Sequence, residues 1–72
     1  MVANDFLAIL SVESVLSSSP HPELRRLLVI ESEEEVQLIG NVTSYYLKQL
    51  AQESIRAALS GRRLKNLIEV TR

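Results

Sequence analysis

Two segments of the chain alternate apolar and polar residues, which predicts β-strands because successive strand side chains point to opposite faces. They are residues 36–42 and residues 64–71. Gly40 interrupts the first of them, which indicates the close approach of a packed helix or a bulge. Residues 24–31 are rich in Leu, Val and Ile and lie between a proline and a run of glutamates, so we predict a further strand there.

Helical spacing marks the N-terminal part of the chain. Apolar residues recur at helical intervals over residues 5–17, after Asn4 or Asp5, either of which can cap a helix with its side-chain oxygen. Pro20 and Pro22 end this pattern, because proline lacks an N–H donor and disfavours helical geometry in the residue before it. We therefore predict a first helix over residues 5–17.

A second helix is predicted between the two alternating segments. Thr43 or Ser44 can cap its N-terminus, and Gly61 suits its C-terminal end because glycine tolerates the left-handed conformation that closes a helix. The apolar and small residues of its expected buried stripe are Leu47, Leu50, Ala51, Ser54, Ile55 and Ala58.

The predicted order of elements is α-β-β-α-β, which defines an α+β fold. Residues 32–35 form the turn between the first two strands, where the glutamates repel one another and stay in water. Because two helices can cover only one face of such a sheet, we expect a two-layer sandwich with both helices on one face of a three-stranded mixed sheet.

The length of 72 residues indicates a single domain. A core of this size supplies only about 3–5 kcal/mol of net stability. The chain has no cysteine, so neither disulfides nor thiolate metal sites can add to that stability. Association with a second copy or with another surface is a natural way to make up the deficit.

The net charge of −1 argues against a strongly basic nucleic-acid binder. Its distribution is uneven, because residues 1–40 carry two basic and seven acidic side chains, a net charge of −5. Residues 41–72 carry six basic and two acidic side chains, a net charge of +4. This polarity suits head-to-tail or self-complementary association, although a solvated surface of mixed charge is the simpler interpretation.

No segment is apolar enough to cross a bilayer, and the apolar-rich residues 1–16 are interrupted by Asp5 and Glu13. This stretch also lacks the basic residues and the cleavage site of a signal peptide. We therefore expect a cytoplasmic protein, or a periplasmic one if the chain has been trimmed.

Three motifs carry a family resemblance. They are the segment VQLIGNV at residues 36–42, the following helix with Lys48 and Ala51, and Gly61 followed by LKNLIEV at residues 64–70. In these features the chain resembles the BON domain, a small module of bacterial proteins linked to osmotic stress, secretins and membranes. The resemblance is clearest over residues 27–70, and residues 1–72 would form one such domain.

The resemblance implies an α-β-β-α-β fold and a binding role, directed to phospholipid membranes, proteins or peptidoglycan-associated surfaces. Three residues of the motifs have expected structural roles. Gly40 leaves room for the second helix, Gly61 closes that helix, and Asn66 points inward and bonds backbone at a turn or strand end. The glycine usual in the first hairpin of the family is absent, and residues 32–35 take its place.

Little in the chain points to catalysis. His21, the only histidine, lies between two prolines, and no cysteine or second histidine can complete a metal site. The serines at residues 17–19 lack a positioned histidine and carboxylate, and the glutamates at residues 31–35 lack the spacing of a calcium loop. We therefore predict no enzyme activity, no cofactor and no bound metal.

The uncovered face of the sheet is the predicted interaction site. If the helices cover the even-numbered residues of the last two strands, Ile39 and Leu67 point the other way. The first strand is apolar on both faces, and its two candidate pairs are Leu28 with Ile30 and Leu27 with Val29. One of these pairs joins Ile39 and Leu67 outside, and with the first pair the candidate interaction face is Ile39, Leu67, Leu28 and Ile30. Such a stripe marks a contact surface, so we expect homo-oligomerisation through this face or through an edge strand.

A second candidate contact is basic. Arg56, Arg62, Arg63 and Lys65 lie near the end of the second helix and would meet an anion: a phospholipid headgroup, a nucleic acid or the glutamates of another copy. Cations there also favour the C-terminal end of the helix dipole, which is a purely structural role. Each would add only about 1 kcal/mol at an anionic membrane, so that binding would be weak. The aromatic residues are not interleaved with them, which disfavours nucleic acid.

The chain is thus expected to be a non-catalytic BON-like binding module that self-associates through an apolar sheet face or an edge. Weak peripheral binding to an anionic phospholipid membrane through the basic residues is the alternative.

Overall fold

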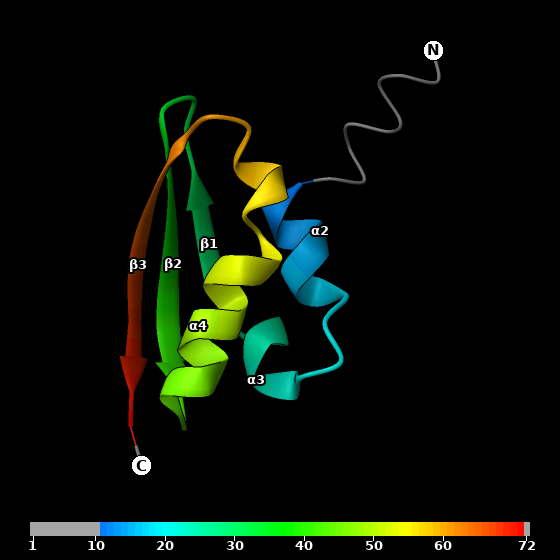
Figure 1. Ribbon diagram of the computed structural model, residues 1–72, viewed down its shortest axis with the longest axis vertical. Helices are drawn as coiled ribbons and strands as arrows, with labels where there is room; N and C mark the ends of the chain where they lie inside the picture. The colour runs from blue at the N-terminus through cyan, green and yellow to red at the C-terminus, as the bar shows by residue number, and fades with distance from the viewer. Residues whose placement is uncertain (1–10, 72) are drawn as a thin grey trace.

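A computed structural model describes residues 11–71 of the protein. Within this range a three-stranded sheet forms one layer, and the helices form a second layer on one face of it (Figure 1). This arrangement confirms the predicted α+β sandwich with a mixed sheet. The other face of the sheet carries no described element (Figure 1).

The sheet has the order β1-β2-β3, with strands β1 (Leu28–Glu31), β2 (Glu35–Val42) and β3 (Arg63–Val70). Strand β2 is antiparallel to β1 and parallel to β3. The last two strands lie within one residue of the predicted ranges, because strict alternation over seven or eight residues is a strong strand signal. Their parallel pairing requires a crossover, which the second predicted helix supplies.

The β1–β2 hairpin turns without a glycine. The Ser32 hydroxyl accepts hydrogen bonds from the backbone N–H groups of Glu34 (3.3 Å) and Glu35 (3.1 Å), and the Ser32 N–H donates to the Glu35 carbonyl at 2.8 Å. A serine side chain that bonds the backbone two or three residues onward can hold a tight turn by itself. Glu31, Glu33 and Glu34 are exposed, as expected, whereas Glu35 is half-buried.

The first described helix, α2 (Val12–Ser17), begins later than predicted. Ser11 has extended backbone geometry, with φ −68° and ψ 149°, and its hydroxyl accepts from the Ser14 N–H at 3.2 Å. The prediction of one continuous helix through residue 11 was therefore wrong, because serine at this position acts as an N-cap. The predicted part before residue 11 lies outside the described residues.

A short helix, α3 (Pro22–Arg25), replaces the first half of the strand predicted over residues 24–31. Pro22 occupies the first turn, where its fixed φ suits a helix and its missing N–H would have no partner anyway. Leu24 points into the core and is fully buried. Helix α2 ends at Ser17, before Pro20, and Pro22 starts the next helix, so the residues after it do not all belong to a strand.

The crossover helix α4 (Tyr45–Ser54) is capped by Ser44, whose hydroxyl accepts from the Leu47 N–H at 3.3 Å. It ends seven residues before Gly61, and a 3-10 turn, η1 (Ala57–Leu59), continues the path. The prediction that α4 itself extends to Gly61 was thus wrong. Gly61 does adopt the expected left-handed conformation, with φ 84°, but it follows η1 and a left-handed Ser60.

The core lies between the two layers. Strands β2 and β3 contribute alternate residues, and the helices contribute their apolar sides. The fully buried large side chains are Leu24, Leu38, Ile55, Ile68, Val12, Val36 and Val42. The predicted inward register of both long strands is therefore confirmed.

Gly40 leaves room for a different neighbour from the one predicted. A Cβ atom at this position would lie 2.8 Å from Leu27 Cδ2 and would have no helix atom within 4 Å. The residue that requires glycine is thus Leu27, just before β1, and the prediction that α4 fills this space was wrong. The backbone adds a second reason, because φ is +147° at Gly40.

Among residues 11–71, no helix has both the length and the apolar character that a membrane span requires.

Candidate functional site

The open face of the sheet carries the four apolar residues of the predicted interaction face. Leu28, Ile39 and Leu67 are aligned across the three strands, because Leu28 pairs with Ile39 and Ile39 pairs with Leu67. Leu28 is 57% exposed, Leu67 is 46% exposed and Ile39 is half-buried. Ile30, also 46% exposed, lies in the next row beside Gln37.

The structure also decides between the two candidate faces of the first strand. Leu27 and Val29 are half-buried and pack against the core, whereas Leu28 and Ile30 point away from the helices. The sequence could not make this choice because both faces of the strand are apolar. We call Leu28, Ile30, Ile39 and Leu67 the apolar row patch from here on.

Polar residues surround the apolar row patch on the same face. Gln37 and Asn41 flank Ile39 on β2, and Lys65 and Glu69 flank Leu67 on β3, each two residues away along its strand. The Gln37 amide donates to the Glu35 carboxylate at 2.8 Å, which confirms that these two side chains share a face. The open face therefore has an apolar centre and a polar rim, the usual anatomy of an interface.

The free edge of β3 is partly closed by its own side chains. Arg63 and Thr71 donate their backbone N–H groups to Glu34 and Val42, so the odd-numbered residues of β3 bond β2. Because bonding to one neighbour alternates along a parallel strand, the even-numbered N–H groups face the free edge. The Asn66 side-chain oxygen accepts from the Ile68 N–H at 3.1 Å.

Asn66 therefore covers a backbone donor that an added strand would need. Its amide also donates to Gln52 on α4 at 3.0 Å, which ties the edge strand to the helix layer. The predicted inward position of Asn66 is confirmed, and its backbone partner lies in its own strand. The opposite edge strand, β1, has only four residues. Both edges are thus poor templates for strand addition, which favours the face over the edge.

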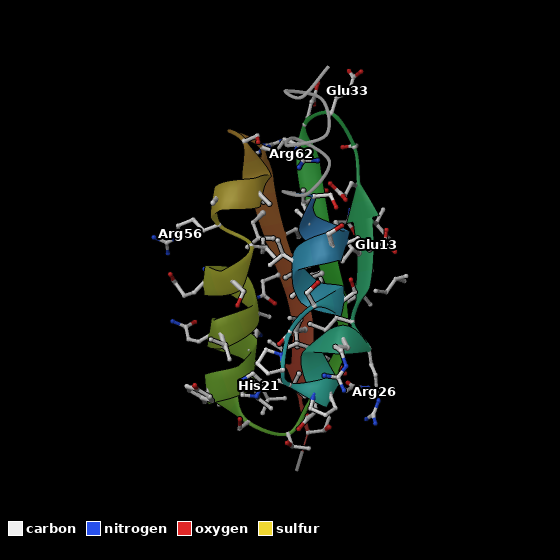
Figure 2. All side chains as sticks on the ribbon, turned by 90° about the vertical axis from the view of Figure 1, so that its right-hand side faces the viewer. Glu13, His21, Arg26, Glu33, Arg56 and Arg62 are labelled. Carbon is white, nitrogen blue, oxygen red and sulfur yellow. The ribbon has the colours of Figure 1, made fainter. Side chains whose placement is uncertain are left out.

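The four basic residues do not form one patch. Arg56 lies on the helix layer, is exposed, and pairs with Glu53 at 2.6 Å. Arg63 and Lys65 are exposed on the open face of the sheet. In Figure 2 the labelled Arg56 extends away from the molecule, while Arg62 points toward the hairpin that carries Glu33.

Arg62 is occupied by neighbouring acceptors. Its guanidinium donates to the Glu31 carboxylate at 2.8 Å and to the carbonyls of Leu59 (2.8 Å) and Ala58 (2.9 Å). It thus closes the C-terminal end of η1 and fastens it to the β1–β2 hairpin. A guanidinium with these partners is less available to an external anion than its position in the sequence suggests.

Several contacts among the described residues could not be predicted from local sequence patterns. The Glu23 carboxylate accepts from both the N–H and the hydroxyl of Thr43, each at 2.8 Å, and so joins α3 to the end of β2. His21 meets the Tyr46 ring edge-on, with centroids 6.5 Å apart. Tyr45 and Tyr46 are 69% and 66% exposed. The partners are far apart in sequence, so no spacing rule connects them.

Glu69 is a charged residue of the open face that was not among the predicted site residues. The signal was available, because Lys65 and Glu69 lie at equal distances on either side of Leu67 in a strand. Opposite charges placed symmetrically about an apolar residue indicate a self-complementary strip.

The fold and the open face define a small α+β protein with a helix layer on one side of a mixed sheet. No family model matches the chain, and no curated protein or solved structure is found to be similar to it. Among residues 11–71 there is no pocket and no group of acidic or histidine side chains arranged to hold a metal ion.

Proposed function

We propose that the protein is a non-catalytic binding and assembly module of the BON type, which associates with a second copy of itself through the open face of the sheet. The order β1, β2, α4, β3 after the N-terminal helices and the pairing of residues 36–42 with residues 64–70 support the BON-type part of this proposal. The predicted binding role of such modules agrees with an exposed surface of mixed apolar and polar character.

The observation that carries the proposal is the apolar row patch. Its members come from all three strands, and three of them, Leu28, Ile30 and Leu67, are about half exposed. Large apolar side chains gathered on one face, with polar residues around them, are typical of contact surfaces. Burial of these side chains would also enlarge the effective core of a small domain.

The area of the face suits a weak dimer. Strands lie about 4.8 Å apart and rise about 3.3 Å per residue, so two strands of eight residues and one of four give a face of roughly 300 Å² per copy if it is treated as flat. Two copies would bury roughly 600–900 Å², which is below the roughly 1,200–2,000 Å² of stable interfaces and typical of weak, transient ones. We therefore expect association in the micromolar range rather than a permanent dimer.

Sedimentation across a concentration series tests this function. The wild-type chain should shift from monomer to dimer between about 1 and 100 μM, the range in which small interfaces associate. Ile39→Glu should remain monomeric, because it places a charge at the centre of the apolar row patch. Gln49→Glu adds the same charge at an exposed position of α4 and should associate like the wild type.

Two results would overturn the proposal. One is a wild-type chain that stays monomeric at every concentration, and the other is equal association of Ile39→Glu and the wild type. The same samples should be mixed with anionic and neutral vesicles. Stronger binding to anionic vesicles, lost in an Arg63→Ala/Lys65→Ala variant, would favour a membrane-surface role over self-association.

A further inference from the structure

The charges of the open face are arranged symmetrically on β3. Lys65, Leu67 and Glu69 follow one another at two-residue steps, so their side chains point to the same face. Lys65 and Glu69 are exposed, and within residues 11–71 neither has an ion-pair partner. They are about 13 Å apart along the strand, too far to pair within one copy.

Leu67 lies midway between these charges and also belongs to the row that crosses the sheet. The register aligns Leu28, Ile39 and Leu67 in a line roughly perpendicular to the strands. Consider two copies whose open faces are opposed, with a two-fold axis midway between the sheets and parallel to this row. This axis would reverse the strand direction of the second copy. Each residue of the row would then face its own counterpart.

We propose that the second copy binds through this two-fold axis, so that Lys65 of each copy pairs with Glu69 of the other across the open faces. This inference rests on the proposed function, because it specifies the geometry of the same association. Leu67 of each copy lies at the axis, and the two ion pairs lie on either side of it. On β2 the same operation places Gln37 opposite Asn41, two amides that can hydrogen-bond to each other.

The other simple face-to-face arrangement fits the charges less well. A two-fold axis parallel to the strands would place β3 over β1 of the second copy. Lys65 would then lie over Ile30, because both belong to the row of Gln37. An ammonium group over an apolar side chain would lose water without gaining an anion, which is unfavourable. The perpendicular axis provides an anion for each lysine.

A charge exchange on β3 tests the pairing. Lys65→Glu and Glu69→Lys should each raise the dimer dissociation constant about 10-fold, because each replaces two attractive contacts per dimer with two repulsive ones. The double variant Lys65→Glu/Glu69→Lys should return to within about 3-fold of the wild type, since the pairs are re-formed with exchanged signs. Both positions are exposed, and circular dichroism should show that each variant keeps the fold.

Cross-linking tests the axis directly, because the chain contains no cysteine. Leu67→Cys should form a covalent dimer with a short bis-maleimide linker, since facing sheets lie about 10 Å apart and the two cysteines would be opposite each other. Gln49→Cys on the helix layer is the control and should remain monomeric. An equimolar mixture of Leu67→Cys and Leu28→Cys chains should give mainly like-with-like products under the perpendicular axis.

The results distinguish the two-fold axis from the proposed function on which it rests. If the wild type dimerises but the double variant has a dissociation constant as high as the single variants, the perpendicular axis is wrong and the association stands. The same conclusion follows if mixed Leu67–Leu28 products dominate. If the wild type does not dimerise at all, the proposed function and the axis both fail. Rescue by the double variant together with like-with-like cross-links supports the axis.

Discussion

The two faces of the sheet differ completely in their surroundings, although they are built from alternating residues of the same strands. On β2, Leu38 is fully buried beneath the helices, whereas its neighbour Ile39 lies half-buried on the open face. On β3, Ile68 is 1% exposed and its neighbour Leu67 is 46% exposed. One step along the chain therefore moves a large apolar side chain from the core to the surface.

Under the proposed association, stability and self-association are carried by separate sets of residues. The covered face holds the fold together, and its largest side chains, such as Leu38 and Ile68, are almost fully buried. The open face adds little to the monomer, so its composition is free to serve binding. Substitutions at neighbouring positions should therefore have very different effects, and comparing them tests the division.

The largest expected effects are at the fully buried residues of the covered face, such as Leu38. Leu38→Ala should lower the free energy of unfolding by about 3 kcal/mol, because it leaves a cavity in a fully buried site. In a domain of about 3–5 kcal/mol total stability, much of the protein would unfold. Urea titration followed by far-UV circular dichroism measures this change. Ile39→Ala is the matched control and should cost less than about 1 kcal/mol in dilute solution.

Gly40 should show the next largest effect. Gly40→Ala should cost about 2 kcal/mol, because its Cβ would meet Leu27 Cδ2 at 2.8 Å and because φ is +147°. Gly61→Ala has a similar backbone constraint, with φ +84°, but open space around the new Cβ. It should cost about 1 kcal/mol. Equal losses in urea titration would show that the contact with Leu27 does not matter.

The sequence predicted the inner face of the sheet well because its signals are local. Alternation in residues 36–42 and residues 64–70 sets both the strands and their inward sides, and Ser44 caps the crossover helix as expected. The order of elements follows from these segments and from the length of the connections. Each of these features depends on residues close together in the chain.

The features that the sequence could not supply depend on distant partners or on competing local signals. The apolar run after Pro22 suits a strand and a helical turn about equally, and the burial of Leu24 in the core favours the helical turn. Which side of the first strand faces outward depends on the packing of Leu27 against Gly40. The sequence named the residues of the candidate contacts but not how they lie together. The four basic residues, for example, lie on different surfaces of the protein.

Arg62 and Arg56 extend the comparison to charged groups. Arg62→Ala should lower the free energy of unfolding by about 1 kcal/mol, because it removes bonds to Glu31 and to two carbonyls in a partly buried position. Arg56→Ala removes only an exposed pair with Glu53 and should cost less than about 0.5 kcal/mol. Thermal or urea unfolding of the two variants, side by side, measures the difference. Equal costs would contradict the structural role of Arg62.

The smallest effect on monomer stability is expected at Leu67, and it is the sharpest test of the division between faces. Leu67→Ser should change the free energy of unfolding in dilute solution by less than about 0.5 kcal/mol, because the side chain is already 46% exposed. Ile68→Ser, one residue later, should cost about 3 kcal/mol or more because it puts a hydroxyl into the core.

At concentrations where the wild type is dimeric, the substitution of Leu67 should have a measurable effect on apparent stability. Leu67→Ser should then lose apparent stability relative to the wild type, because binding between folded copies stabilises only the chain that can associate. A stability of Leu67→Ser that matches the wild type when dilute and falls behind it when concentrated is the expected signature. If the gap between them is the same at both concentrations, Leu67 acts within the monomer and the open face is not the site of association.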